Sequence, residues 1–253
     1  LRIKLKHLDT YLSDRNKADL VFEAVSKGLV EKDFIVIDGL SEVEIKKAIK
    51  YSKSAKRSQS LWEGYKDCEV HPYLEKKKVL SYGLRIDDKD RLVIPLMDID
   101  LSIVGLQYID PEGKKLFLTG SKKSGSFFIL GQEILKSSDK IYFCEGYATG
   151  ASIYKDMEQP VFVAFDAYNL LPVVEKVFEV MKDRKFVFIA DNDDSKTGEK
   201  EAKKACQYII KNKGRAEVLM PETQGDYNDH ANSGEGELMP PALQVLDVAK
   251  EVD

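Results

Sequence analysis

The feature that most constrains the fold is an alternation of short apolar runs and amphipathic segments over residues 139–231. The runs at 141–144, 161–164, 186–190 and 216–220 have the length and composition of strands that are buried on both faces. The segments between them carry apolar residues at helical spacing. This pattern predicts βαβ units in an α/β fold, with a Rossmann-like parallel sheet and helices on both faces.

The two longer helices of this region are predicted from apolar residues three and four positions apart. The first helix would bury Val173, Val174, Val177, Phe178 and Met181. The second would bury Ala202, Ala205, Cys206, Ile209 and Ile210. Gly198 and Gly214 are the expected boundary residues of the second helix.

Residues 1–138, which precede this region, have different sequence patterns. Short β-rich runs at 92–97, 103–109, 116–118 and 127–130 are separated by polar turns, which predicts an antiparallel meander within a mixed α+β lobe. Residues 1–70 are Lys-rich and helical in pattern, with one apolar run at 34–37. We therefore expect N-terminal helices (1–70), a strand-rich lobe (71–138), the parallel-sheet domain (139–232) and a C-terminal tail or helix (233–253).

Composition excludes some classes of protein. No apolar run approaches the length needed to span a bilayer, so we expect no membrane association. The three cysteines are far apart and form no CxxC pair, which argues against a zinc ribbon or a disulfide scaffold and favours reduced thiols in the cytoplasm. A net charge of −4 neither indicates nor excludes a nucleic-acid binder. The chain begins with Leu1, as a piece of a longer protein would.

Acidic residues follow every strand of the predicted parallel sheet. They are Glu145, Asp166, Asp191 with Asp193, and Asp226 with Asp229. One such acid commonly caps a helix, but several at one rim repel each other unless a cation neutralises them. Because no His or Cys stands at these positions, the set suits Mg²⁺ or Mn²⁺. In extended backbone Asp191 and Asp193 share a face, so both could reach one ion.

Basic residues of the strand-rich lobe have two possible roles. They could line a groove for a single-stranded template, or form a solvated surface. The residues concerned are Arg85, Arg91, Lys114, Lys115, Lys122 and Lys123. The run at 76–78 is interpreted as a solvated helix face, and His71 as structural. His230 is interpreted as a neighbour of the acidic rim, and Trp62 with Tyr65 as an anchor for the N-terminal region.

Several of these segments together resemble a known family. The run 144–147, the Asp-Asn-Asp at 191–193 and Gly198 resemble the TOPRIM domain, which is found in DnaG-type primases, type IA and type II topoisomerases, OLD-family nucleases and recombination mediators. The segments 145–150, 164–170 and 225–229 resemble primases of plasmids and phages, and 71–107 resembles the lobe that precedes TOPRIM in them.

The resemblance implies roles for individual residues. Asp191 and Asp193 would bind metal, and Glu145 would be a further ligand or the general base on a 3′-hydroxyl. Asp226, Asp229 and Asp166 would extend the site towards further ions and the nucleotide, with one to three ions in total. Thr149 departs from the pattern, because cellular primases commonly carry another acid there.

The implied function is that of a primase catalytic core. It would make short RNA primers from ribonucleoside triphosphates on a single-stranded DNA template, with a replicative helicase as a possible partner. A metal-dependent nuclease of the OLD or RNase type is one alternative, against which the upstream lobe argues. A non-catalytic scaffold for replication is another, against which the intact acids argue. A type IA topoisomerase would need a longer chain with a nucleophilic tyrosine.

Overall fold

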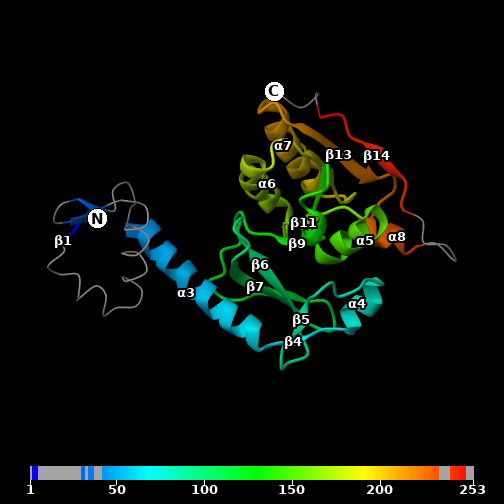
Figure 1. Cartoon of the computed structure of the whole chain (residues 1–253). Helices are drawn as coiled ribbons and strands as arrows, with labels where there is room; N and C mark the ends of the chain where they lie inside the picture. Colours follow the sequence, from blue (N-terminus) through cyan, green and yellow to red (C-terminus); the bar gives the residue numbers. More distant parts are fainter. Residues whose placement is uncertain (1, 5–29, 32–33, 37–41, 234–239, 249–253) are drawn as a thin grey trace.

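The computed structural model describes residues 2–4, 30–31, 34–36, 42–233 and 240–248. The predicted first helix, with Asp14 as its cap and Gly28 at its end, lies outside the described residues. The strands of the described part form three sheets, and the two larger sheets make up the body of the molecule (Figure 1). No helix among the described residues is long and apolar enough to cross a membrane.

The central sheet has the order β14-β13-β12-β10-β11-β9. Its four middle strands run parallel, which confirms the predicted βαβ organisation. They are β10 (Lys140–Cys144), β11 (Val161–Val163), β12 (Lys185–Ile189) and β13 (Arg215–Pro221). The outer strands β9 (Phe128–Leu130) and β14 (Leu243–Val245) run antiparallel to their neighbours.

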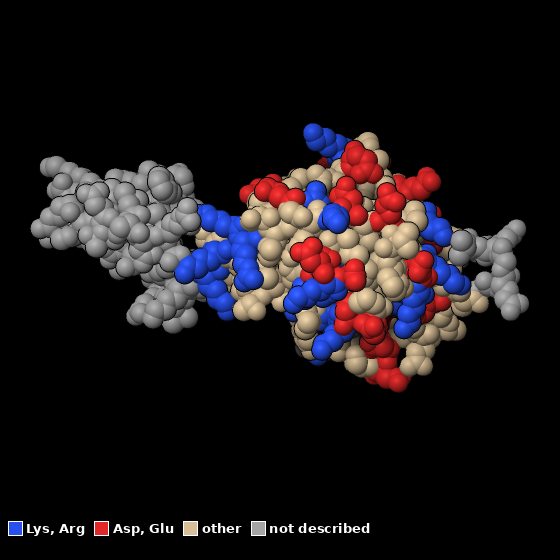
Figure 2. All heavy atoms as spheres, turned by 90° about the horizontal axis from the view of Figure 1, so that it is seen from below, with Lys and Arg blue, Asp and Glu red and all other residues tan. Residues whose placement is uncertain are grey.

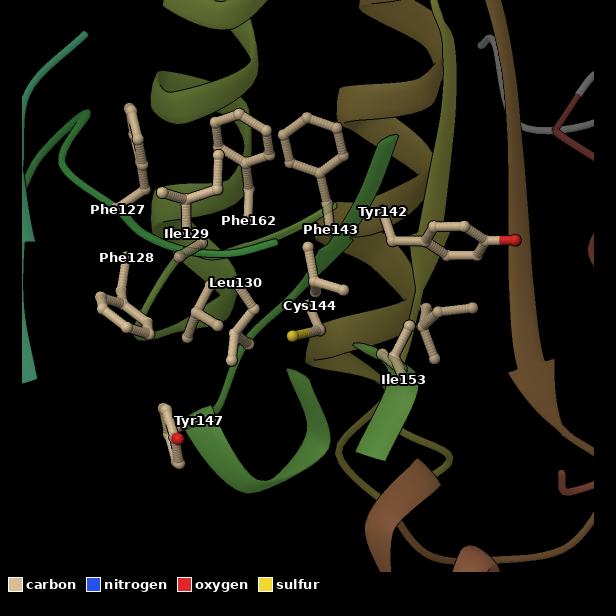
Figure 3. Close-up of a cluster of buried hydrophobic side chains, with 14 of the residues drawn as sticks. Phe127, Phe128, Ile129, Leu130, Tyr142, Phe143, Cys144, Tyr147, Ile153 and Phe162 are labelled. Atoms are coloured by element: carbon tan, nitrogen blue, oxygen red, sulfur yellow. The ribbon is translucent and has the colours of Figure 1, made fainter. Parts of the chain in front are cut away.

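Helices cover both faces of this sheet (Figure 1). One face carries α6 (Leu170–Val180) and α7 (Thr197–Lys211), and the other carries α5 (Tyr147–Met157) and α8 (Tyr227–Ala231). Alternate strand residues serve the two faces: Phe143 and Phe162 point to one side and Cys144 to the other (Figure 3). Phe143 stacks on Phe162 with ring centroids 5.2 Å apart, so aromatic packing forms the centre of the core.

The second sheet is an antiparallel meander in the order β4-β5-β6-β7-β8. Its strands are β4 (Lys66–Asp67), β5 (Arg85–Ile86), β6 (Leu92–Met97), β7 (Ile103–Ile109) and β8 (Lys115–Phe117). The helix α4 (Pro72–Lys77) lies between β4 and β5 in the chain. The long helix α3 (Glu42–Gly64) packs on β7, where Trp62 and Tyr65 cover buried Leu106 and Tyr108. The predicted anchoring role of Trp62 and Tyr65 is therefore confirmed.

Three expectations about the fold need correction. Within the run at 127–130, Phe127 forms an isolated bridge with Met97 of β6, but residues 128–130 leave the meander and, as β9, pair with β11 in the central sheet. Ile210 is 49% exposed, because its neighbour Ile209 already occupies the buried face of α7. Residues 1–70 also contain four of the described strands: β4 of the meander, and a small sheet of β1 (Arg2–Lys4), β2 (Val30–Glu31) and β3 (Phe34–Val36).

Candidate metal centre and active site

The carboxyl ends of the parallel strands bring acidic residues together at one rim of the central sheet. Glu145 follows β10 directly, and Asp191 comes two residues after β12. Asp166 follows β11, and Asp226 lies between β13 and α8. Parallel strands end at the same edge, so residues that are distant in sequence become neighbours there.

The electrostatic centre of the rim is the pair Glu145 and Asp191. Burial raises the pKa of Asp191 to about 7, and the charges of Asp226 and Asp193 add to the shift. Burial also raises the pKa of Glu145 to about 7, and Asp191 is the next cause. Lys115 lowers the pKa of Asp191 but does not outweigh the other effects. Without a cation, these two carboxylates are therefore costly to ionise at neutral pH.

One atom of this pair is left without a partner. The Oδ1 atom of Asp191 is buried and accepts no hydrogen bond. A buried carboxylate oxygen without a donor is rare in folded proteins and commonly indicates a missing ion or water. No three acidic, His or Cys side chains in the described residues already have ligand geometry, so an ion would have to draw the carboxylates together. The donor set of carboxylate oxygens fits a hard divalent cation.

A short backbone contact brings Asp226 next to Asp191. Asn192 and Gly225 form an isolated antiparallel bridge, with N–O distances of 3.1 and 2.8 Å. Gly225 has a φ of +130°, which a residue with a side chain rarely adopts. The bridge joins the loops after β12 and β13, so their acids face the same space. Asp226 also caps α8 by accepting the N–H of Asp229 at 2.9 Å.

The remaining predicted ligands have local partners. Asp193 is exposed and accepts hydrogen bonds from Ser195 Oγ at 2.7 Å and from the N–H of Lys196 at 2.9 Å. Asp166 accepts the N–H of Asn169 at 3.1 Å and forms an ion pair with Lys123. Both acids still raise the pKa of Glu145, so they lie within electrostatic reach of the centre.

Gly198 explains how Glu145 fits against α7. A Cβ atom at this position would lie 2.5 Å from Oε1 of Glu145. Any side chain there would push the carboxylate out of its place, because real Cβ atoms do not approach so closely. The glycine expected as a helix boundary is therefore the residue that allows α7 to begin beside the acid.

A cavity of about 360 Å³ opens at this rim. It is lined by Tyr73, Lys76, Lys77, Glu112, Gly113, Lys115, Glu145, Gly146, Ala148, Thr149, Phe165, Asp166, Asp191 and Asp226. Acids of the central sheet therefore form one wall, and lysines of the lobe form the other. Such a cavity suits a ligand that carries both phosphates and bound cations.

Lys77 is a site residue that the sequence did not reveal. Its Nζ lies 3.0 Å from Oδ1 of Asp229 and 3.9 Å from Oδ2 of Asp226. The run 76–78 was expected to be a solvated helix face, but α4 packs beside α8, where Asn228 donates to the carbonyl of Lys77 at 2.8 Å. Tyr73 shares this wall, and burial together with the charge of Asp226 raises its pKa to about 12.

Of the other predicted basic contacts, Lys115 lines the cavity and the two arginines do not. Arg91 binds Asp87 through two nitrogens, at 2.9 and 2.5 Å, and lies over the ring of Tyr108. Arg85 lies over Trp62 and 3.3 Å from Asp67. Both arginines are held by other parts of the protein, because each has an acid and an aromatic ring within reach: Arg91 within the meander, and Arg85 between β4 and Trp62 of α3.

The predicted lysines of the lobe differ in their surroundings. Lys122 contacts Asp98 at 2.7 Å, and Lys123 pairs with Asp166. Lys114 is exposed. On the face seen in Figure 2, acidic and basic side chains alternate over the body, whereas Lys and Arg gather on α3. An extended basic groove along the lobe is therefore interrupted by acids.

The two histidines among the described residues, His71 and His230, have structural surroundings. His71 caps α4 by accepting the N–H of Tyr73 at 3.2 Å, and its Nε2 lies 2.9 Å from the carbonyl of Asp90, as its structural interpretation predicts. His230 contacts Thr223, with Nε2 at 3.0 Å from the carbonyl oxygen. His230 does not line the cavity, so its proximity to the rim gives it no place in the site.

Each of three motifs places an acid of the rim close to a buried residue that fixes the lobe. Tyr147, two residues after Glu145, donates its hydroxyl to the carbonyl of Ser81 at 2.6 Å. Asn169, three residues after Asp166, accepts the N–H of a lobe glycine at 2.7 Å. Asn228, two residues after Asp226, binds α4 as described above. These contacts hold the two walls of the cavity in register.

Comparison with known proteins agrees with the resemblance to the TOPRIM domain that the sequence motifs indicate. Residues 140–236 match the family described as Toprim domain. A DNA primase TraC of Escherichia coli is 30% identical over 128 residues, which covers 49% of this chain and 12% of that protein. A second Escherichia coli DNA primase TraC is 29% identical over 125 residues, covering 48% and 9%. The chain therefore spans about a tenth of the length of these relatives.

Solved structures share the fold. The primase fragment of the bacteriophage T7 primase-helicase protein has a TM-score of 0.53 at 19% identity, covering 66% of this chain and 71% of that one. The DnaG primase catalytic domain bound to ssDNA has a TM-score of 0.52 at 11% identity, covering 74% and 75%. At these identities the likeness concerns the fold.

Fold and site together define an α/β domain of the TOPRIM type, with a carboxylate rim at the ends of its parallel strands. Within that class the chain resembles DnaG-like primases, and its curated relatives bear the name DNA primase TraC. The resemblance that the motifs predict is thereby confirmed. Divalent metals are typical of this class.

Proposed function

We propose that this chain is a primase catalytic core that joins ribonucleotides into short RNA primers on single-stranded DNA. The observation that carries the proposal is the buried, unpartnered Oδ1 of Asp191, which faces a cavity with acids on one wall and lysines on the other. Acids that need cations and lysines that suit phosphates together fit a nucleoside triphosphate with its metal ions. The names of the curated relatives favour the primase reaction over a nuclease.

The residues present fit one to three Mg²⁺ or Mn²⁺ ions. Asp191 and Asp193 would hold an ion together, with Glu145, Asp226 and Asp166 as further ligands. Bound ions of this kind neutralise and align the phosphate groups during an in-line displacement. The supporting observation is the raised pKa of Asp191 and of Glu145, since a cation placed between the carboxylates would relieve their repulsion.

Glu145 is the residue best placed for proton transfer. Glu145 lines the cavity beside Asp191, and a carboxylate there that does not itself bind an ion can accept a proton as a general base. In the proposed reaction Glu145 takes the proton of the primer 3′-hydroxyl. The 3′-oxygen then forms a bond to the α-phosphorus, and the bond from that phosphorus to the leaving pyrophosphate breaks.

Lysines of the lobe would bind the triphosphate. Lys115 lies near the rim, with Nζ 3.7 Å from the position of a Cβ on Gly146. Lys77 reaches Asp226 and Asp229, and it would exchange these partners for phosphate oxygens when a nucleotide binds. Asp229 would then adjoin the nucleotide, as the resemblance implies. Lys114, Lys122 and Lys123 would lead the template towards the cavity.

The proposed division of labour follows the expected domains. Residues 71–138 would supply the lysine side chains that bind the substrate, and residues 139–232 would supply the carboxylates. The strand β9 would link the two parts, because it precedes residue 139 but lies in the central sheet. A replicative helicase is a proposed partner, because the T7 relative is a primase-helicase protein. Replicating DNA in the cytoplasm is the proposed place of action.

A direct assay tests the proposal. The chain is incubated with Mg²⁺ or Mn²⁺, labelled ribonucleotides and single-stranded DNA, and compared with Asp191→Ala. We expect labelled oligoribonucleotides from the wild type and none from Asp191→Ala. Asp194→Ala is the matched control, because Asp194 is an exposed acid of the same loop that does not line the cavity. Degradation of the DNA without synthesis would show a nuclease instead.

A further inference from the structure

A second groove borders the acidic rim and shares no lining residue with the first cavity. It has a volume of about 590 Å³, with Tyr168 on one side and the first turns of α7 on the other. Both sides touch the site directly: the N–H of Ala167 hydrogen-bonds to Glu145, and Gly198 of α7 lies against the same carboxylate. The groove therefore begins where the reacting groups would be.

Tyr168 is an unusual surface residue. Tyr168 is 71% exposed, although its neighbours Ala167 and Asn169 are buried. Asn169 fixes this short helix η3 (Ala167–Asn169), because its side chain donates to the carbonyls of Ser126 at 2.9 Å and Ala164 at 2.7 Å. The aromatic ring thus projects from rigid backbone, which gives a preorganised flat surface for stacking.

The opposite side of the groove has an excess of positive charge. Lys203 pairs with Glu199 at 2.8 Å, and Lys204 pairs with Glu201 at 2.6 Å. These contacts neutralise the acids that line the groove. Lys196 and Lys200 are exposed and form no ion pair with any residue that the structure describes. Two cations are therefore available to phosphate groups.

We propose that this groove binds a single strand of nucleic acid next to the acidic rim. Tyr168 stacks on a base, and Lys196 and Lys200 contact successive phosphates. An aromatic platform beside a basic groove is the arrangement that holds single strands without reading their sequence. The inference rests on the proposed function for the identity of the strand, which is DNA if the groove holds template and RNA if it holds primer.

The test measures binding without catalysis. Fluorescence anisotropy follows the whole chain with labelled single-stranded DNA and RNA of the same sequence, in EDTA and at several salt concentrations. We expect Tyr168→Ala to weaken binding about tenfold with an unchanged salt dependence, and Tyr168→Phe to bind like the wild type. The double variant Lys196→Gln with Lys200→Gln should also weaken binding, and should lower the slope of log affinity against log salt by about 1.4.

Lys136→Gln is the matched control. Lys136 is exposed and lies just before β10, at the opposite end of the parallel strands from the acids. The groove is supported if the variants lose affinity for either probe while the control does not, and the more affected probe identifies the strand. It is overturned if Tyr168→Ala binds both probes like the wild type, or if Lys136→Gln weakens binding as much as the double variant.

This readout separates the two proposals. If the wild type makes no primers but the groove variants lose binding to the oligonucleotides, the primase function is contradicted and the proposal that the groove binds single strands is supported. If the wild type makes primers and the variants bind both probes like the wild type, the proposal that the groove binds single strands is contradicted and the primase function is supported.

Discussion

Two regions of this molecule surround their acidic residues in opposite ways. In the lobe, burial alone would raise the pKa of Asp98, but hydrogen bonds from Lys122 and Lys176 outweigh it and hold the pKa at about 2. At the rim, burial raises the pKa of Asp191 to about 7, and neighbouring acids add to the shift. The lobe therefore uses its carboxylates to stabilise the fold. The rim keeps carboxylates that destabilise it, which is typical of a site reserved for a ligand.

The largest expected effect is that of Asp191→Asn, which removes one charged carboxylate from the rim. We expect primer synthesis to fall about a thousandfold, because several kcal/mol of charge stabilisation would be lost with the bound ions. In metal-free buffer at pH 8 the same variant should be more stable than the wild type, because a neutral amide removes the repulsion. Activity assays and urea unfolding measure the two effects. For contrast, Asp98→Asn should lower stability, and the comparison fails if both variants shift stability in the same direction.

The pH dependence of stability tests the rim as a whole. In the folded chain the pKa of Glu145 and of Asp191 is about 7, against ordinary values of 4.5 and 3.8. Between pH 4 and 7 the unfolded chain has lost protons that the folded chain retains, so stability should fall as pH rises through this window. One carboxylate whose pKa is raised by about three units contributes about 4 kcal/mol, and the two carboxylates share part of their shifts, so we expect a loss of between about 4 and 8 kcal/mol in EDTA, measured by urea unfolding. Added Mg²⁺ should abolish most of it; an equal loss with Mg²⁺ would contradict a metal site.

Removing a basic side chain from the lobe should lower the stability of the fold, whereas removing an acid from the rim should raise it. Arg91→Met leaves the side chain of Asp87, which is 4% exposed, without its bidentate partner. We expect the free energy of unfolding to fall by about 3 kcal/mol, as for a broken buried ion pair. The double variant with Asp87→Asn should recover part of this loss in chemical denaturation. An unchanged stability in Arg91→Met would remove the distinction between the two regions.

The contacts between the regions should contribute less. Asn228 is 1% exposed, and it donates to the carbonyl of Lys77 and to Ser152 Oγ at 2.8 and 2.9 Å. Asn228→Ala should cost about 2 kcal/mol, because the buried Ser152 Oγ loses its donor and the carbonyl of Lys77 keeps only its hydrogen bond from Asn232. Asn232→Ala is the matched control: Asn232 also donates to Lys77, but it lies nearer the surface. Equal thermal unfolding of the two variants would argue against the tether.

The smallest expected effect concerns Lys115, the lobe residue that acts on the rim. It lowers the pKa of Asp191, so Lys115→Met should raise that pKa further. Because Lys115 is exposed, the metal-free stability at pH 8 should fall by only a few tenths of a kcal/mol. Lys114→Met, its exposed neighbour outside the cavity, should show no change in the same titration.

The central sheet could be predicted from the sequence because its strands are continuously apolar and regularly spaced. The acids of the rim followed from the same pattern, since parallel strands end together. The lobe was harder to predict. The run at 127–130 looks like any other short strand, and only its partner β11 shows which sheet it belongs to.

The cationic wall could be predicted only in part: Lys115 was among the expected basic contacts, whereas Lys76 and Lys77 were not. Lys77 reaches Asp229 across most of the chain, and nothing in the local pattern of α4 distinguishes it from Lys76. Arg85 and Arg91 have the composition of phosphate ligands, but an acid and a ring hold each of them in the meander. Periodicity shows which face of an element is buried. It does not show which distant element will cover that face.

The bridge between Asn192 and Gly225 sets the order in which the acids can gather during synthesis. When the ribosome has made the chain only as far as α7, Glu145 and Asp191 exist but the loop that carries Asp226 does not. The carboxylate cluster is complete only after β13 has joined β12 and the bridge has closed. A nascent chain at this stage therefore lacks Asp226 at the rim, and the complete set of acids forms only after the scaffold that surrounds it.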